Sequence, residues 1–306
     1  MRRIPILLLI AAVPAIHAQD FSQVKVTVTP VAGSVYMLQG AGGNIGLSVG
    51  QDDAFVIDDQ YAPLTPRIKA AIATVTSKPV KFVVNTHWHG DHSGGNENMA
   101  NAGAIIVAHQ NVRKRMSADQ FMEALKQKVP ASPVAALPVV TFTEAITFFV
   151  NGDTVDVMHV APAHTDGDAI ITFRAANVVH MGDTYFNGFY PFIDVSSGGS
   201  IDGIIAAADR VLAASNASTK IIPGHGPLGD RASLKQYRDV MFGARAKIAR
   251  LIAQKRSIAQ ILAAKPLAEY DSTWGNGFMK PEQFITIVHS SLTTHAPLKA
   301  TQHHDR

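Results

Sequence analysis

A dense cluster of histidine and aspartate directly follows a predicted strand. Residues 85–95 read NTHWHGDHSGG, so three histidines and one aspartate fall within six positions. In extended backbone His87 and His89 point to the same side, and the glycine that follows lets the chain turn before Asp91 and His92. Such a loop can hold two metal ions, but two ions need more than four ligands. The chain must therefore bring ligands to this loop from distant segments.

Three more candidate ligands stand where predicted strands end, each beside glycine or proline. They are His164 in APAHTDGD, Asp183 in HMGDTYF and His225 in IIPGHGPLG. The chain has no cysteine, so any metal ligands are nitrogen and oxygen atoms. Imidazole and carboxylate groups suit zinc, with iron or manganese as the alternatives.

The first half of the chain is predicted to begin with strands and to continue with helices. Short alternating segments bounded by Gly, Asp or Pro predict strands at 24–29, 34–40, 43–50 and 54–58, and apolar runs predict two more at 80–85 and 104–108.

Two helices are expected in this half. Thr65 can cap the first, with Pro66 at its first position, and the pattern continues to about Val75. Ser117 and Gln120 stand in capping-box positions, which predicts a second helix over the stretch SADQFMEALKQ.

The second half repeats this order. Asn151 and Gly152 form a two-residue hairpin signal between apolar segments. Strands are predicted at 146–150, 154–160, 169–173, 178–182 and 220–222, and helices at 201–214 and from 231 to about 261. Strands grouped before helices in each half predict an α+β fold of two ββα layers stacked sheet on sheet. The tail from about residue 294 has no periodicity and is expected to be mobile.

The motif order resembles the metallo-β-lactamase superfamily. That order is H-x-H-x-D-H, then His, then Asp, then His, with GD and PGHG around the last two. The resemblance runs from the first strands to the PGHG loop and implies a four-layer αββα sandwich with a metal site at one edge. It implies one ion on His87, His89 and His164, a second on Asp91, His92 and His225, and Asp183 bridging both. It also implies that Asp58, which ends a predicted strand, orients the metal loop from behind.

The ligand set favours hydrolysis. Two ions about 3.5–4 Å apart lower the pKa of a shared water towards 7, so that a metal-bridging hydroxide can attack a carbonyl at neutral pH. Asp91 is expected to accept or relay a proton as well as bind metal. No separate nucleophile stands out. The sequence therefore predicts a metal-dependent hydrolase with two zinc ions per chain.

The substrate class is narrowed by two positions. Zinc β-lactamases place a cysteine where this chain has Asp183, and often a lysine where it has Phe186. Aspartate at 183 resembles the lactonase and thioesterase branches. A cyclic or activated acyl bond, in a β-lactam or a lactone, is the expected target. The alternatives are a thioester hydrolase of the hydroxyacylglutathione-hydrolase type, a mononuclear iron persulfide dioxygenase, and a zinc-binding protein without catalysis.

An aromatic segment, YFNGFYPFID at Tyr185–Asp194, follows the bridging aspartate. It is predicted to wall the substrate site and to act as a lid, with a hydrophobic strap over the core as the alternative. Tyr185 or Tyr190 is expected to donate a hydrogen bond to a developing oxyanion.

The N-terminus resembles a targeting segment. Arg2 and Arg3, the apolar run 4–13 and a small residue before the cut predict a secretory signal peptide over 1–18. Residues 19–306 show no linker and are expected to form one domain, periplasmic or secreted.

Charge and hydropathy exclude some partners. Removing Arg2 and Arg3 from the 27 basic residues leaves 25 against 24 acidic ones, so no basic surface for nucleic acid is expected. No later stretch reaches about 18 apolar residues, so membrane insertion after cleavage is not expected. A small-molecule substrate is the expected partner, and the oligomeric state stays open.

Overall fold

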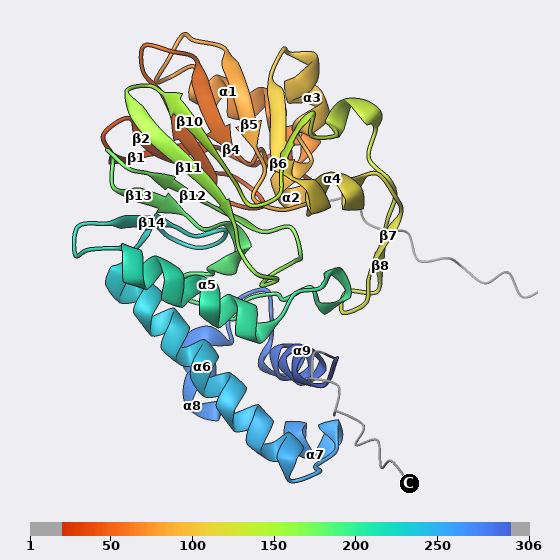
Figure 1. Cartoon of the computed structure of the whole chain (residues 1–306). Helices are drawn as coiled ribbons and strands as arrows, with labels where there is room; N and C mark the ends of the chain where they lie inside the picture. The colour runs from red at the N-terminus through yellow and green to blue at the C-terminus, as the bar shows by residue number, and fades with distance from the viewer. Residues whose placement is uncertain (1–19, 295–306) are drawn as a thin grey trace, which may run out of the picture.

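The computed structural model describes residues 20–294. The predicted signal peptide and the tail from residue 295 lie outside the described residues. Two β-sheets pack face to face, with helices on both outer faces (Figure 1). The predicted four-layer α+β sandwich is therefore confirmed.

The first sheet has seven strands in the order β1-β2-β3-β4-β5-β6-β9. Their bounds are β1 (Thr27–Ala32), β2 (Val35–Gln39), β3 (Ile45–Ser48), β4 (Ala54–Ile57), β5 (Val80–Val84), β6 (Ile105–His109) and β9 (Val140–Phe142). The first four strands pair antiparallel, as predicted, and β4, β5, β6 and β9 pair parallel. The carboxyl ends of β4, β5 and β6 therefore meet at one edge of the sheet.

Short helices follow the strands of this sheet. They are α1 (Thr65–Ile72), α2 (Gly90–Ser93), α3 (Asn96–Asn101) and α4 (Gln110–Met116). Helices α1 and α3 pack on the outer face of the sheet, whereas α2 and α4 lie at the edge where the parallel strands end (Figure 1). The expected cap of α1 is wrong by one residue, because Leu64 takes the cap position and Thr65 is already helical. The helix also ends earlier than the predicted Val75. Ile68 and Ile72 of α1 pack with Leu47 and Val56 of the sheet.

The predicted helix over 117–127 is wrong. The segment forms a hairpin of β7 (Gln120–Met122) and β8 (Gln127–Val129). The two capping-box residues end the preceding helix instead of starting a new one. The Ser117 hydroxyl donates to the Arg113 carbonyl at 2.6 Å, and the Gln120 amide donates to the Arg115 carbonyl at 3.0 Å.

The second sheet has the order β10-β11-β12-β13-β14-β15. Its strands are β10 (Ala145–Val150), β11 (Asp153–His159), β12 (Ala169–Phe173), β13 (Val178–His180), β14 (Lys220–Ile222) and β15 (Gly229–Asp230). The hairpin at Asn151 and Gly152 is confirmed, with φ of 54° and 74°, the left-handed values that this turn requires. Pairing is antiparallel except between β13 and β14.

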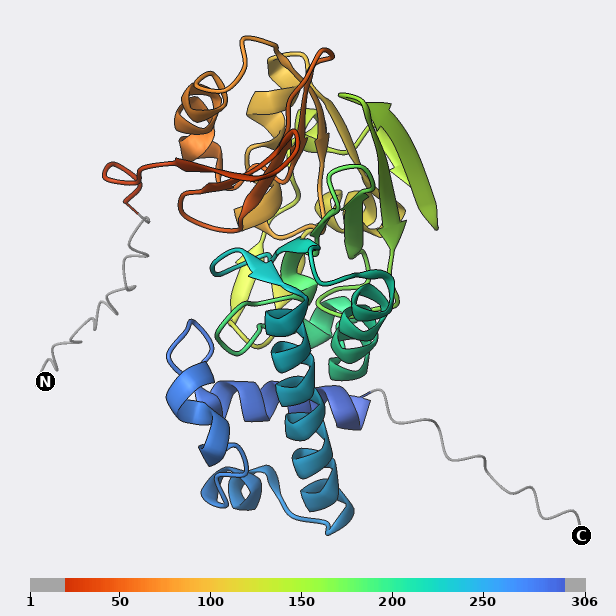
Figure 2. The same ribbon diagram turned by 90° about the vertical axis from the view of Figure 1, so that its left-hand side faces the viewer.

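The outer face of the second sheet carries a larger helical layer. The helices are α5 (Ile201–Ala214), α6 (Arg231–Ala253), α7 (Ile258–Ala263), α8 (Ala268–Trp274) and α9 (Pro281–Thr294). The predicted helix 201–214 is confirmed, and the expected helix from 231 is divided into α6 and α7. Figure 2 shows α6 extending away from the sheets, with α9 packed across it. No helix among residues 20–294 has the length and apolarity needed to cross a bilayer.

Three hydrophobic cores hold these layers together, one of which is the contact of α1 with the first sheet described above. Phe55, Val157 and Phe173 are fully buried between the sheets. The second sheet and its helices enclose the largest core, which includes Tyr237 and Phe284. Burial of apolar surface stabilises a fold by about 25 cal/mol per Å². Because these cores are closely packed, the sandwich forms a rigid support for the loops at its edge.

Candidate metal centre

The histidine-rich loop is fixed at the end of β5. His89 takes the N-cap position of α2, and the Ser93 hydroxyl donates to the carbonyls of Trp88 and His89 at 3.0 and 3.1 Å. Gly90 begins this short helix with an ordinary negative φ, so it is helical and does not supply the expected special turn.

The other predicted ligands arrive on three loops at the same edge. His164 lies between β11 and β12, and Asp183 lies in the 3-10 turn Gly182–Thr184 after β13. His225 follows β14, and because β13 and β14 are parallel neighbours their ends deliver Asp183 and His225 side by side. The amide of Gly224 donates to the Gly182 carbonyl at 2.7 Å and ties the two loops together.

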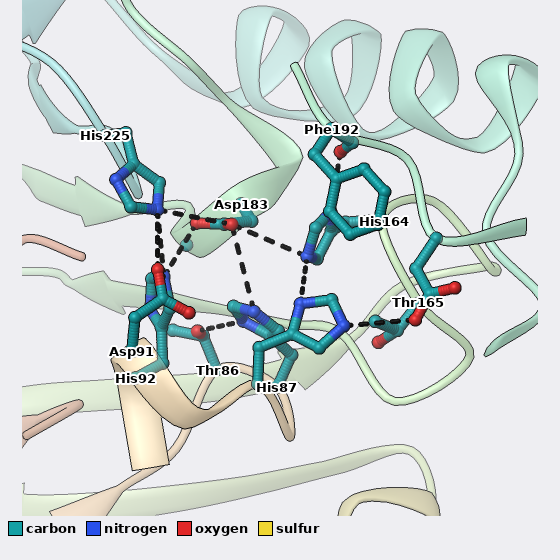
Figure 3. A network of polar contacts seen from close by, with 12 residues as sticks. Thr86, His87, Asp91, His92, His164, Thr165, Asp183, Phe192 and His225 are labelled. Carbon is teal, nitrogen blue, oxygen red and sulfur yellow. Dashed lines mark hydrogen bonds and ion pairs between the residues drawn. The ribbon is translucent and has the colours of Figure 1, made fainter. Parts of the chain in front are cut away.

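All seven predicted ligands converge in one cluster (Figure 3). Their ligand atoms form overlapping sets, each with all atoms within 4.8 Å of one another: His87, His89 and His164; His87, His92 and Asp183; and Asp91, His92 and His225. Most of these residues are buried, but the side chains of Asp91 and His225 are each 23% exposed. The cluster therefore opens to solvent on the side of Asp91 and His225.

Asp183 lies between the two outer sets. Its Oδ2 atom is 3.5 Å from the Nε2 atoms of both His164 and His225. Its Oδ1 atom is 3.0 Å from the Nε2 atom of His92. This central position is the one that a bridging carboxylate requires.

Asp58 contacts the metal loop from behind, as the resemblance implied. Its Oδ2 atom accepts from the Nδ1 atom of His92 at 2.7 Å and from the Thr86 hydroxyl at 2.8 Å. The Thr86 oxygen lies 3.0 Å from the Nδ1 atom of His87. One buried carboxylate thus fixes two imidazoles with Nε2 facing the cluster.

Asp194 makes a second contact of this kind, which the sequence analysis missed. Its Oδ2 atom lies 3.1 Å from the Nε2 atom of His89, so the Nδ1 atom of His89 faces the Nε2 atom of His164 at 2.8 Å. The Nδ1 atom of His164 donates to the Phe192 carbonyl at 2.8 Å. Phe192 and Asp194 lie at the end of the aromatic segment. No motif spacing relates this segment to the histidine loop, so no sequence signal indicates these contacts.

The electrostatics of the cluster suit cation binding. Burial lowers the pKa of His164 to about 4 and that of His87 well below its ordinary value, so both imidazoles are neutral ligands at pH 7. Burial opposes ionisation of Asp183, but the surrounding histidines outweigh burial and hold its pKa well below the usual range. Burial opposes protonation of His225, yet Asp183 and Asp91 raise its pKa to about 9.

The donor set fits divalent ions such as zinc. The Nε2 atom of His87 is buried without a hydrogen-bond partner, a costly state for a polar atom. The Oδ1 atom of Asp183 faces the Nε2 atom of His92 at 3.0 Å, but the proton of that imidazole is already directed from Nδ1 to Asp58. Zn–N bonds of about 2.0–2.1 Å with tetrahedral geometry need ligand atoms about 3.4 Å apart, close to the separations around Asp183. Nitrogen and oxygen donors with fixed tautomers therefore satisfy the requirement for bound metal.

A glycine-containing loop before β3 also shapes the centre, although no sequence motif marks it. A Cβ atom on Gly43 would overlap the His92 ring. The Gly43 amide donates to the Asp91 carbonyl at 3.0 Å, and its carbonyl accepts from the Gln60 side chain at 2.6 Å. Gln60 and Asp58 both adopt positive φ, 55° and 61°, and such strain concentrates at functional sites.

The geometry argues against the oxyanion role expected of the two tyrosines. Tyr185 is fully buried, its hydroxyl lies close to Gly229, and its ring packs on Tyr237. The Tyr190 hydroxyl donates to Asp271 at 2.9 Å. Both tyrosine hydroxyls therefore lie within the helical layer and not in the metal centre.

The aromatic segment Tyr185–Asp194 combines the two expected roles of wall and strap. Phe186 stacks on His225, with ring centroids 5.1 Å apart, and Phe192 lies 5.7 Å from His164. Both side chains are buried. The segment therefore forms one wall of the metal centre, and its burial does not support a lid.

A sequence model of the metallo-β-lactamase superfamily matches residues 29–239 of the chain. This range includes every residue of the cluster. The chain belongs to the metallo-β-lactamase superfamily. The resemblance read from the motif order is thus confirmed, and the expectation of a metal-dependent hydrolase agrees with it.

Several characterised proteins are similar over part of the chain. The hydroxyacylglutathione hydrolase of Nitrosococcus oceani is 28% identical over 176 residues, 56% of this chain and 57% of that protein. The hydroxyacylglutathione hydrolase of Erythrobacter litoralis is 30% identical over 108 residues, 35% of each chain. The 2,4-dinitroanisole O-demethylase subunit alpha of a Nocardioides species is 24% identical, over 54% of this chain and 48% of that protein. The chain thus spans about a third to somewhat over half of their lengths.

Solved structures share the fold. A metallo-β-lactamase from Pontibacter korlensis superposes with a TM-score of 0.58 at 20% identity, covering 71% of this chain and 99% of that one. The sec-alkylsulfatase Pisa1 from Pseudomonas reaches a TM-score of 0.65 at 15% identity, covering 87% and 50%. At these identities the similarity establishes the architecture alone.

Proposed function

We propose that this chain is an exported hydrolase that uses two zinc ions to cleave a cyclic or activated acyl bond. The observation that supports it most directly is the position of Asp183 between two ligand sets. A single bound ion would leave either His164 or His225 without a role. Lactones and activated esters are the preferred substrates within this class.

Each part of the chain has a defined task in this proposal. His87, His89 and His164 would hold one ion and Asp91, His92 and His225 the other, with Asp183 shared. When bound, the ions supply Lewis-acid polarisation of the acyl carbonyl and an activated water. The partly exposed Asp91 carboxylate can accept a proton at Oδ2, which lies 3.3 Å from the Nε2 atom of His225. Phe186 and Phe192 keep bulk water away from one side of the cluster.

β-Lactams are weaker candidates than lactones. In zinc β-lactamases a lysine often occupies the position of Phe186 and holds the carboxylate of the drug. Here the Phe186 ring stacks on His225 and is buried. No cation at this position is available to a substrate carboxylate.

Thioester hydrolysis is the second candidate. It is favoured by the similarity to two hydroxyacylglutathione hydrolases. The iron persulfide dioxygenase and the zinc-binding protein without catalysis remain alternatives for the same ligands. The complete set of Asp91, His92 and His225 favours a second ion and therefore hydrolysis.

Metal analysis joined to a substrate panel tests the proposal. We expect two zinc ions per chain, and about one strongly bound ion in either His164→Ala or His225→Ala. The panel contains a chromogenic cephalosporin, aryl esters, a γ-lactone and a thioester. One iron per chain with no hydrolysis would overturn the proposal, as would two ions at unchanged affinity in both variants.

Export is a separate part of the proposal. It rests on the targeting pattern of residues 1–18. N-terminal sequencing of protein from a periplasmic fraction should find a start near Gln19. Protein that retains Met1 and stays in the cytoplasm would contradict it.

A further inference from the structure

A row of aromatic rings leads outward from the metal centre. The Phe186 ring stacks on His225 at a centroid distance of 5.1 Å and an angle of 23°. Phe189 meets Phe186 edge to face at 5.7 Å and 83°. Phe186 is buried, whereas Phe189 is partly exposed, so the row runs from the ligand His225 to the surface.

The loop between α8 and α9 supports the outer end of this row. A Cβ atom on Gly277 would lie 2.6 Å from the Phe189 Cβ atom and 2.7 Å from two of its ring atoms. The loop backbone thus lies directly against the Phe189 side chain, and only glycine permits this approach. The neighbouring Phe278 is 65% exposed.

The C-terminal helices fix this arrangement. The Tyr190 amide donates to the Trp274 carbonyl at 2.9 Å, and the Tyr190 ring stacks on Phe284 at 4.5 Å. These contacts attach the aromatic segment to α8 and α9. Both helices lie beyond residue 239, where the superfamily match ends. The outer part of the wall is therefore built by a portion of the chain outside the matched range.

We propose that this aromatic wall, defined as Phe186, Phe189 and the loop 275–280, binds an alkyl or aryl substituent of the substrate. The inference rests on the proposed function and narrows it to esters or lactones that carry an apolar group. Apolar surface placed against such rings leaves water, and each methylene that becomes fully buried favours binding about fourfold. Stacked and edge-to-face rings also present the geometry that an aryl group prefers.

Chain-length series test the wall. One series is the p-nitrophenyl esters of acetate, butyrate and hexanoate, and the other is γ-lactones with alkyl side chains of the same increasing length. In the zinc-loaded protein we expect kcat/KM for the longest member to exceed that for the shortest by about tenfold or more in at least one series. A flat response in both series would overturn the proposal.

Variants assign the effect to the wall. Phe189→Ala should reduce the long-to-short ratio towards one, and Phe189→Leu should retain most of it. Gly277→Ala should also reduce the ratio, because the new methyl group displaces the Phe189 ring. Phe242, on α6 and 50% exposed, provides the matched control, and Phe242→Ala should leave the ratio unchanged. Circular dichroism confirms that each variant is folded.

A binding measurement separates this inference from the proposed function. Calorimetry compares sodium hexanoate with sodium acetate as ligands of the zinc-loaded protein, and hexanoate should bind about tenfold more tightly. If no ester, lactone or thioester is hydrolysed, the proposed function fails, while tighter binding of hexanoate still supports an apolar wall. Equal affinities, or a preference that survives Phe189→Ala, would refute the wall.

Discussion

The Nδ1 atom of His92 lies 2.7 Å from the Oδ2 atom of Asp58, with both side chains fully buried. This contact directs the Nε2 atom of His92 to Asp183 and the second ligand set. Asp194 holds His89 in the same manner at 3.1 Å, on the other side of the cluster. Asp58 therefore contacts the second set directly and reaches His87 of the first set only through Thr86, whereas Asp194 contacts the first set alone.

Asp58→Asn should weaken binding of the ion proposed for Asp91, His92 and His225 by about 10–100-fold, because a neutral amide accepts a weaker hydrogen bond from the His92 imidazole and raises its basicity less. Zinc titration against a competing chelator measures this affinity. Asp194→Asn is the reciprocal control and should weaken the ion held by the other set. Loss of the same ion in both variants would show that the two carboxylates do not serve separate sites.

The metal-free protein should lose stability as the pH rises from about 7 to about 9.5. The pKa of His225 is about 9 in the fold and 6.5 in the reference state, so its proton stabilises the fold below pH 6.5 and this contribution is lost as the pH rises through about 9. Each kcal/mol lost should lower Tm by roughly 2–4 °C. Calorimetric scans of the metal-free protein measure this decline.

His225→Gln supplies the control for this pH effect. Without the titrating imidazole, the decline in Tm between these pH values should become smaller. Zinc-loaded protein should also show less decline, because a bound ion replaces the proton. An equal decline in His225→Gln and the wild type would assign the effect to another group.

Two glycines near the metal loop should respond in opposite ways to alanine. A methyl group on Gly43 would overlap the His92 ring, so Gly43→Ala should reduce affinity for the second zinc by about tenfold or more. A methyl group on Gly90 would meet no atom within 4 Å, and its φ is ordinary, so Gly90→Ala should keep both ions and gain about 0.4–1 kcal/mol of stability. Zinc content and thermal unfolding of both variants check this pair; equal losses would refute it.

Local sequence patterns predicted much of the fold and many residues of the metal centre. His164, Asp183 and His225 each stand near the end of a predicted strand with glycine or proline close by, and the resemblance carried by the motif order groups residues as distant as His87 and His225. The Asn151-Gly152 hairpin was predictable because its φ values are a local demand of the turn. The resemblance implied the role of Asp58, and the structure places this residue directly after β4, which pairs with β5 in the same sheet.

Features that depend on tertiary contacts could not be predicted in this way. The contacts of Gly43 with His92, of Asp194 with His89 and of Gly277 with Phe189 each join residues at least 49 positions apart. No local sequence spacing indicates these pairs. The Ser117 pattern is ambiguous because the same hydroxyl can end one helix or start another. Because Tyr185 and Tyr190 follow Asp183 closely in the sequence, this proximity predicts both side chains in the metal centre. In the structure their rings pack in the core of the helical layer instead.

Asp183 decides how the two ligand sets cooperate. Its two oxygens face different histidines, His92 at 3.0 Å and His164 at 3.5 Å, so one side chain fixes the separation of both sets. Asp183→Ala should therefore cost more than the loss of a simple ligand, and we expect hydrolysis to fall by roughly 10² or more. Rates with a γ-lactone measure the effect, and unchanged rates would show that Asp183 has no bridging role.

Asp183→Cys tests why a carboxylate occupies this position. A thiolate serves one ion and leaves the other freer, so the variant should keep some zinc and some hydrolysis. Because zinc β-lactamases carry cysteine here, activity on a chromogenic cephalosporin should rise relative to activity on a γ-lactone. The gain should stay small, since Phe186 stacks on His225 where a cation would be needed to hold the carboxylate of the drug. A cephalosporin-to-lactone ratio that falls in Asp183→Cys would contradict this account of substrate choice.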